Sequence, residues 1–224
     1  MTAVKICGLK TPEMVRHAAA CGADWVGFVL APASPRNVLG EGPGGFDLLF
    51  DLIFAAAGAE VKCVALVADA DARTLAALSG AVQPDVFQFH GAETPAFIAS
   101  FASDLAPSVE VWKAQPVSTP ADLERAETYH LTDRLLLDAR PPKGAARTGG
   151  HGATFDWAIL DGWRPPRPWL LAGGLTPGNV AEAITRTRAL AVDVSSGVET
   201  APGVKDAGRI ADFIRAAKGQ ENNG

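Results

Sequence analysis

Cysteine is scarce in this sequence, and the few cysteines do not form a framework. The 224 residues contain three of them, Cys7, Cys21 and Cys63. An odd and widely spaced set excludes a network of disulfides and is typical of a protein that works in a reducing compartment. The sequence also lacks an H-E-x-x-H pattern and a Cys/His cluster, so we expect no metal site.

Long apolar runs and an excess of positive charge are missing as well. No apolar run is long enough to cross a bilayer, and the opening MTAVKICGLK lacks the apolar core of a signal peptide. Basic residues number 20 against 25 acidic ones, for a net charge of −5, which does not suit a nucleic-acid or membrane surface. We therefore expect a cytoplasmic protein without nucleic-acid or membrane partners, in which local donors hold any anionic ligand.

The sequence does contain a regular succession of short apolar or β-branched runs. They cover residues 4–9, 25–30, 62–67, 85–90, 109–114, 134–138, 168–172 and 190–195. Most are continuous rather than alternating, as expected for parallel strands that are buried on both faces. Alanine-rich segments of helical character separate them, and one of these opens at Thr11 and closes near Gly22. The last segment has an apolar face at helical spacing, made of Ile210, Phe213, Ile214 and Ala217.

Eight strand–helix repeats predict a single-domain (β/α)8 barrel, the TIM-barrel fold, over residues 1–224. The alternative is a doubly wound open sheet, which usually has fewer strands and a G-x-G-x-x-G turn after its first strand; that turn is absent here. Two stretches break the rhythm. Residues 40–45 (GEGPGG) predict a loop before an apolar helix over 46–57, and residues 139–154 predict a loop of the kind that acts as a lid. Residues 219–224 are expected to form a frayed tail.

Two glycine-containing turns near the C-terminus each follow a short apolar strand. The first holds Gly173 and Gly174, with Thr176 and Pro177 as the expected cap and first residue of a helix. The second holds Ser195, Ser196 and Gly197. Adjacent turns of this kind can direct several backbone N–H groups at one point, which predicts a phosphate site. The alternative is a pair of ordinary strand-to-helix turns in which glycine only provides a positive φ.

Chemistry in such a barrel takes place at the carboxyl ends of the strands. Cys7 ends the first predicted strand and Asp138 the sixth. A thiol can remove a proton where nearby positive charge or N–H dipoles lower its pKa, and a carboxylic acid can donate one where burial keeps it protonated. The alternative for Cys7 is the role of a small buried hydrophobe, which we expect for Cys21 and Cys63.

Arg36 follows the second strand and His90 the fourth. The guanidinium of Arg36 can pair with a substrate carboxylate through two parallel hydrogen bonds, although a solvated loop arginine is the simpler interpretation. His90 can hydrogen-bond a substrate or orient its neighbours. Neither a Walker A sequence nor a G-x-S-x-G turn is present.

The ordered motifs KICGL, SPR, QFHG, LLLDA, GGHGATFDW, AGGLTPGNV and DVSSGVE resemble those of the phosphoribosylanthranilate isomerase family of tryptophan biosynthesis. The resemblance extends from Val4 to about Phe213. It implies a (β/α)8 barrel without a cofactor that catalyses the third step from chorismate to tryptophan. In that step an Amadori rearrangement converts N-(5-phosphoribosyl)anthranilate, a small phosphorylated molecule, into 1-(2-carboxyphenylamino)-1-deoxyribulose 5-phosphate.

The resemblance also implies roles for single residues. Cys7 would be the general base and Asp138 the general acid, and Arg36 would meet the anthranilate carboxylate. His90 and Asp193 would contact the substrate, the latter close to the sugar. The phosphate site would comprise Gly173, Gly174, Ser195, Ser196 and Gly197.

Some positions depart from the family pattern. Phe89 stands where a leucine is usual, and His151 and Ala153 replace Thr and Lys of the expected lid. Two other functions remain open at this point. One is another phosphosugar barrel enzyme, such as a ribulose-phosphate epimerase or the isomerase of histidine biosynthesis, the latter of which typically has an Asp on its first strand. The other is a barrel that binds phosphate without catalysis. A monomer and a homodimer are equally compatible with the sequence.

Overall fold

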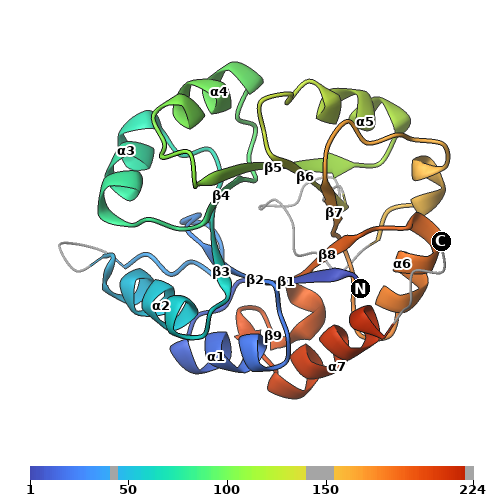
Figure 1. Ribbon diagram of the computed structural model, residues 1–224, viewed down its shortest axis with the longest axis horizontal. Helices are drawn as coiled ribbons and strands as arrows, with labels where there is room; N and C mark the ends of the chain where they lie inside the picture. Colours follow the sequence, from blue (N-terminus) through green and yellow to red (C-terminus); the bar gives the residue numbers. More distant parts are fainter. Residues whose placement is uncertain (41–44, 140–153, 220–224) are drawn as a thin grey trace.

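Eight parallel strands close into a barrel, with each strand paired to the next and β8 paired to β1 (Figure 1). The computed structural model describes residues 1–40, 45–139 and 154–219. The barrel strands are β1 (Ala3–Cys7), β2 (Trp25–Val29), β3 (Lys62–Val67), β4 (Val86–Phe89), β5 (Glu110–Val117), β6 (Arg134–Ala139), β7 (Trp169–Leu171) and β8 (Ala191–Val194). The predicted (β/α)8 barrel is confirmed, and the open sheet is wrong because β1 and β8 close the ring. The extent of the domain, residues 1–224, stays a prediction.

Helices surround the ring of strands (Figure 1). They are α1 (Pro12–Ala20), α2 (Asp47–Gly58), α3 (Ala72–Ala81), α4 (Pro95–Ser103), α5 (Pro120–Glu127), α6 (Val180–Thr187) and α7 (Ala207–Lys218). Between β6 and β7 the described residues contain only a short 3₁₀ helix, η1 (Trp157–Leu160). The helix expected over 46–57 is α2, and the predicted apolar face of α7 is buried in full.

The strand ends differ from the apolar runs in ways that the barrel explains. β5 continues to Val117, beyond the predicted end at residue 114, because its pairing with β6 extends to Val117 and Ala139. Gln115 and Pro116 disfavour a strand in isolation, and the neighbouring strand holds them in one. β4 and β8 are shorter than the predicted runs by one residue at each end.

Local sequence signals set most helix ends. The side chain of Thr11 accepts a hydrogen bond from the backbone N–H of Met14, and Gly22 follows α1 with φ +97°, as predicted. The start of α6 was predicted wrongly. Asn179 Oδ1 accepts from the N–H of Thr176 at 2.7 Å and its Nδ2 donates to the carbonyl of Gly174 at 3.0 Å, so a turn precedes the helix, which begins at Val180.

Side chains that point inward fill the barrel and close it below the mouth. Seven of the eight strands contribute to this inner cluster, which consists of Trp25, Val64, Val86, Trp112, Ala114, Leu136, Leu170, Ala172 and Ala191. Trp25 and Trp112 meet edge to face with ring centroids 5.3 Å apart. A second, larger apolar cluster lies between strands and helices. Because inward residues alternate along a strand, the next inward positions toward the carboxyl ends are those of the barrel mouth.

A short antiparallel hairpin follows β8 and was not anticipated from the sequence. Its strands are β9 (Glu199–Ala201) and β10 (Val204–Lys205), and the 3₁₀ helix η2 (Ser196–Val198) connects it to the barrel.

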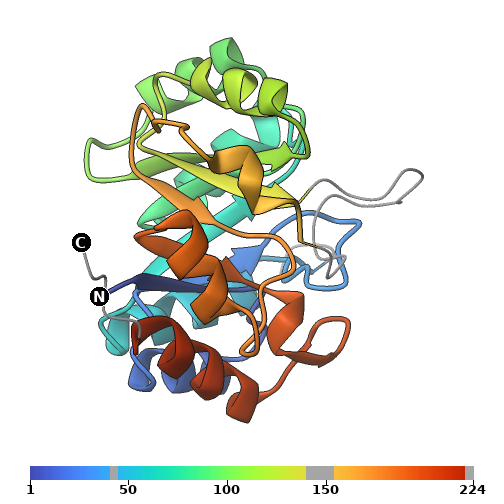
Figure 2. The same cartoon turned by 90° about the vertical axis from the view of Figure 1, so that its right-hand side faces the viewer.

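In the side view of Figure 2 the N-terminus lies on the left, away from the carboxyl ends of the strands.

Several predicted features lie outside the described residues. They are residues 41–44 of the GEGPGG loop, residues 140–153 of the expected lid with His151 and Ala153, and the tail from 220 to 224. Among the helices that the structure does describe, none is long and apolar enough to cross a membrane.

Candidate active site

A pocket opens at the carboxyl ends of the barrel strands. Of the predicted site residues, those that line it are Cys7, Arg36, His90, Asp138, Gly173, Gly174, Asp193, Ser195 and Ser196. They come from the ends of strands β1, β4, β6, β7 and β8 and from the loop after β2. The barrel therefore brings together residues that are far apart in the sequence, and Gly197 alone of the predicted set lies outside the lining.

Cys7 sits at the end of β1 and is 3% exposed. Cys7 pairs with Gly27 on the adjacent strand, β2. A Cβ at Gly27 would lie 2.9 Å from the Cys7 sulfur and 3.2 Å from Nζ of Lys5. The missing side chain at Gly27 therefore makes the space that both functional groups occupy.

Lys5 was not predicted as a site residue, and it is fully buried. It lies two residues before Cys7 on β1, so both side chains point to the same, inner face of the barrel. Its Nζ is 2.7 Å from Oδ1 of Asp193, which pairs with Lys5 in the register of β1 and β8. The predicted sugar contact, Asp193, thus also neutralises a buried ammonium group next to the candidate base.

The pKa of the Cys7 thiol is raised from its ordinary value, mainly because burial penalises the thiolate. The positive charge of Lys5 acts against this effect, as does that of Lys205, while Asp193 reinforces it. Burial therefore outweighs the positive charge near the thiol. Burial also acts to lower the pKa of Lys5, but the charges of Asp193 and Cys7 outweigh it and raise that pKa overall.

Asp138, at the end of β6, is 8% exposed and interacts with His90. His90 Nε2 lies 3.1 Å from Asp138 Oδ2, and His90 Nδ1 lies 3.1 Å from Nε2 of Gln88. In the tautomer that carries its proton on Nε2, His90 donates to Oδ2 of Asp138 and accepts at Nδ1 from the amide of Gln88. Gln88 is fully buried, so this chain of hydrogen bonds fixes the orientation of the candidate acid.

Arg36 lines the pocket, but its guanidinium is bound to a protein carboxylate. Nε and Nη2 each donate to an oxygen of Glu199 at 2.7 Å. The side chain reaches this position past Gly8, where a Cβ would lie 2.6 Å from Cδ of Arg36 and where φ is +79°. The predicted contact with a substrate carboxylate therefore has to use the other edge of the guanidinium.

The two glycine-containing turns differ in what their glycines do. Gly173 and Gly174 have φ of +84° and +63°, a conformation that favours glycine. A Cβ at Gly173 would also lie 2.3 Å from the backbone nitrogen of Ala139. Gly197 packs beneath the first turn, because a Cβ there would lie 1.9 Å from the carbonyl oxygen of Leu175. Gly197 therefore lets the two turns approach each other, and it does not itself line the pocket.

The other two cysteines lie outside this site. Cys63 is buried in β3 and belongs to the apolar cluster beneath the helices. Cys21 follows α1, is partly buried, and has its sulfur 3.5 Å from Nε2 of His17. In the described ranges no group of three His, Cys, Asp or Glu residues is placed to hold a metal ion.

The residues that were missed left weak signals in the sequence. Lys5 shares the spacing of two with Cys7 inside an apolar strand, and Gln88 shares it with His90. Glu199 ends the DVSSGVE motif and Lys205 follows it. The pocket thus offers a thiol, a hydrogen-bonded carboxylate, a guanidinium and two turns with backbone donors, a set that suits acid–base chemistry on a small phosphorylated anion.

The sequence profile of a family described as N-(5'phosphoribosyl)anthranilate (PRA) isomerase matches residues 4–216. The N-(5'-phosphoribosyl)anthranilate isomerase of Hyphomonas neptunium is 48% identical over 223 residues, which cover 99% of both chains. The crystal structure of phosphoribosyl anthranilate isomerase from Thermotoga maritima has a TM-score of 0.82 and 36% identity, over 98% of this chain and 100% of that one.

Two further crystal structures are similar over the same shares of both chains. One is an isomerase in complex with reduced 1-(o-carboxyphenylamino)-1-deoxyribulose 5-phosphate, with a TM-score of 0.76 and 33% identity. The other contains monomers generated from the dimeric Thermotoga maritima enzyme, with a TM-score of 0.77 and 34% identity.

Proposed function

The chain belongs to the N-(5'-phosphoribosyl)anthranilate isomerase family, and we propose that Asp138 and Cys7 are the general acid and general base of its reaction. It is an isomerase of tryptophan biosynthesis that converts N-(5-phosphoribosyl)anthranilate into 1-(2-carboxyphenylamino)-1-deoxyribulose 5-phosphate. The observation that carries the assignment of roles is that a thiol and a carboxylic acid, from β1 and β6, line one pocket together with the glycine turns.

The first step needs a proton on the ring oxygen of the ribose. Asp138 in its protonated form donates it and becomes a carboxylate, the bond between this oxygen and C1′ breaks, and the anilino nitrogen supplies the electron pair that makes an iminium ion. His90 holds Asp138 in place through the 3.1 Å hydrogen bond to Oδ2. Because Gln88 fixes the ring of His90 in turn, the acid has one orientation toward the substrate.

The second step removes the proton on C2′, which the neighbouring iminium acidifies. The thiolate of Cys7 takes this proton, the C–H electrons form the C1′–C2′ double bond, and the π electrons of the iminium return to nitrogen. The resulting enolamine becomes the ketone by tautomerisation. The cationic iminium and the ammonium of Lys5 both favour the thiolate, against the burial that raises the pKa of Cys7.

The two ends of the substrate carry different anions. The turns with Gly173, Gly174, Ser195 and Ser196 suit the phosphate, whose oxygens accept from backbone N–H groups. The free edge of Arg36 suits the anthranilate carboxylate. Asp193, which faces the same pocket, suits a sugar hydroxyl. We expect the enzyme to act in the cytoplasm as a monomer or homodimer.

A fluorescence assay tests this function. Phosphoribosylanthranilate is generated in situ and its loss is followed with and without the purified protein. Turnover at enzymic rates is the expected result. Binding of the reduced product analogue without turnover of substrate would contradict the proposal and favour a barrel that binds phosphosugars without catalysis.

A further inference from the structure

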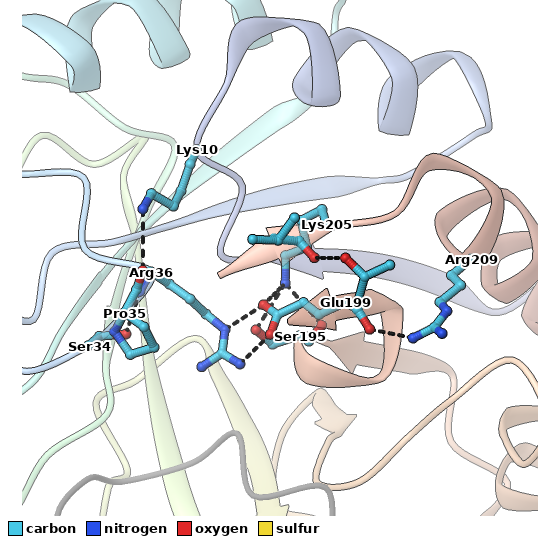
Figure 3. Close-up of polar contacts among 10 residues, drawn as sticks. Lys10, Ser34, Pro35, Arg36, Ser195, Glu199, Lys205 and Arg209 are labelled. Atoms are coloured by element: carbon cyan, nitrogen blue, oxygen red, sulfur yellow. Dashed lines mark hydrogen bonds and ion pairs between the residues drawn. The ribbon is translucent and has the colours of Figure 1, made fainter. Parts of the chain in front are cut away.

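A buried charge network links Arg36 to the second phosphate turn (Figure 3). The Glu199 side chain is 4% exposed and receives two hydrogen bonds from Arg36. It also receives one from Nζ of Lys205, at 2.8 Å. Lys205 in turn donates to the carbonyl and the hydroxyl of Ser195, at 2.9 and 3.2 Å. Glu199 and Lys205 together therefore join Arg36, the predicted ligand of a carboxylate, to the predicted phosphate turn.

The network leaves one edge of Arg36 for a ligand. A guanidinium has five N–H donors, and the contacts with Glu199 use Nε and Nη2. Nη1, on the second edge, makes no hydrogen bond to another residue in the described part of the chain. Arg36 lines the pocket, whereas Glu199 does not. Two cations around one carboxylate leave a net charge of +1, which one substrate carboxylate would neutralise.

The β9–β10 hairpin holds this network against the loop that carries Arg36. Glu199 and Lys205 are paired across the hairpin, and Arg209 of α7 donates to the carbonyl of Glu199. Gly203, in the turn of the hairpin, has φ +80°, and a Cβ there would lie 2.6 Å from the carbonyl oxygen of Pro35. The same carbonyl accepts a hydrogen bond from Lys10 at 3.3 Å, drawn as a dashed line in Figure 3. The hairpin and the Arg36 loop are therefore in direct contact.

We propose that Glu199 and Lys205 are positioning residues that hold Arg36 at a set distance from the phosphate turn, and so make the site selective for ligands with a carboxylate and a phosphate at opposite ends. This inference rests on the proposed function, because it takes Arg36 as the group that binds the substrate carboxylate. Glu199 orients the guanidinium, and Lys205 ties Glu199 to Ser195. Neither residue touches the reacting atoms.

Calorimetric titration with two ligands tests the inference. One is reduced 1-(o-carboxyphenylamino)-1-deoxyribulose 5-phosphate, and the other is the same compound made from aniline, which lacks the carboxylate. Glu199→Gln keeps the shape of the side chain but replaces one acceptor by a donor. This substitution should lower the affinity for the carboxylated ligand about tenfold, within the range for a charge-assisted hydrogen bond. The affinity for the other ligand should stay within about twofold of the wild-type value. In an Arg36→Met background the same substitution should have no further effect.

The controls separate positioning from a general loss of structure. Glu182→Gln, at an exposed position on α6, should change neither affinity. Glu199→Asp keeps the charge on a shorter side chain and should again weaken only the carboxylated ligand. Equal losses for both ligands, or a loss that persists in the Arg36→Met background, would overturn the inference. A wild-type protein without turnover of phosphoribosylanthranilate would refute the proposed function instead.

Discussion

Lys5 and Asp193 form an ion pair between neighbouring barrel strands, with 2.7 Å between Nζ and Oδ1 and side-chain exposures of 0% and 10%. Removing one partner of a buried pair leaves the other charge without compensation. Lys5→Met should therefore lower the free energy of unfolding by about 3–5 kcal/mol. The double variant Lys5→Met/Asp193→Asn should be less destabilised than the sum of the single variants. Urea unfolding of all four proteins measures this coupling, and strictly additive losses would speak against it.

Lys5 should also control the ionisation of Cys7. Because its positive charge opposes the rise in the pKa of the thiol, Lys5→Met should raise that pKa further. Each unit of change lowers the thiolate fraction at a fixed pH about tenfold, and thiolate is the form that iodoacetamide alkylates. The rate at Cys7, followed by peptide mass spectrometry from pH 7 to 10, should fall accordingly. Cys21, outside the pocket, serves as the internal control, and an unchanged rate at Cys7 would exclude this role for Lys5.

The division of labour between Cys7 and Asp138 predicts severe losses in kcat. General acids and bases each contribute about 10²–10⁴-fold. Cys7→Ser replaces the thiol with a far weaker acid, and Asp138→Asn removes the proton that can be transferred. Each should reduce kcat by this amount with only a modest loss of affinity for the reduced product analogue. If both groups serve one turnover, the loss of kcat in the double variant should be smaller than the product of the two single losses.

A neutral change elsewhere calibrates this result. Cys21→Ser alters a cysteine outside the pocket and should keep the wild-type kcat. If Cys7→Ser also kept it, the thiol would not be the base, and Asp193 would be the next candidate because it faces the same pocket.

The phosphate turn predicts a charge-dependent effect at Gly174. Its φ of +63° lies in the left-handed region, which Asp and Asn tolerate better than other residues. Gly174→Asp places a carboxylate against the phosphate, whereas Gly174→Asn adds the same volume without the charge. Binding of the reduced product analogue should therefore collapse in the Asp variant and be weakened less in the Asn variant, while both proteins stay folded by circular dichroism. Equal affinities of the two variants would argue against a phosphate at this turn.

The sequence allowed the barrel and most of the pocket to be predicted for a simple reason. Continuous apolar runs predict parallel strands, and parallel strands in a ring place their carboxyl ends together. Cys7 and Asp138 lie at the carboxyl ends of their strands and Gly173 lies just after β7, so their convergence is a consequence of the fold. The lining of the pocket agrees with this logic.

Long-range partners could not be predicted in the same way. Lys5 and Asp193 are 188 positions apart, and nothing local in either strand shows that they meet. The β9–β10 hairpin is too short for a strand pattern and depends on the pairing of Glu199 with Lys205 and on contacts with the Arg36 loop. The direction of the Cys7 pKa depends on burial, which outweighs the positive charges of Lys5 and Lys205.

Cys63 leads to a prediction about stability in alkaline solution. Burial raises its pKa from 9.0 to about 12, and an unfolded chain would titrate near the unshifted value. Between these values the unfolded state has lost the proton that the folded state keeps, so stability falls as the pH rises. The contribution is fully present below pH 9 and is lost progressively above it. From pH 8 to pH 10 the loss from this one group should be about 1.4 kcal/mol.

Cys63→Ala removes the titrating group and isolates this effect. The substitution has its own cost in packing, but that cost is the same at both pH values. Urea unfolding at pH 8 and pH 10 should therefore show a decline in wild type that exceeds the decline in Cys63→Ala by about 1.4 kcal/mol. Cys7 and the other groups that titrate in this range are present in both proteins and cancel in the comparison. The same decline in both proteins would mean that the Cys63 thiol ionises as readily in the folded state as in the unfolded chain.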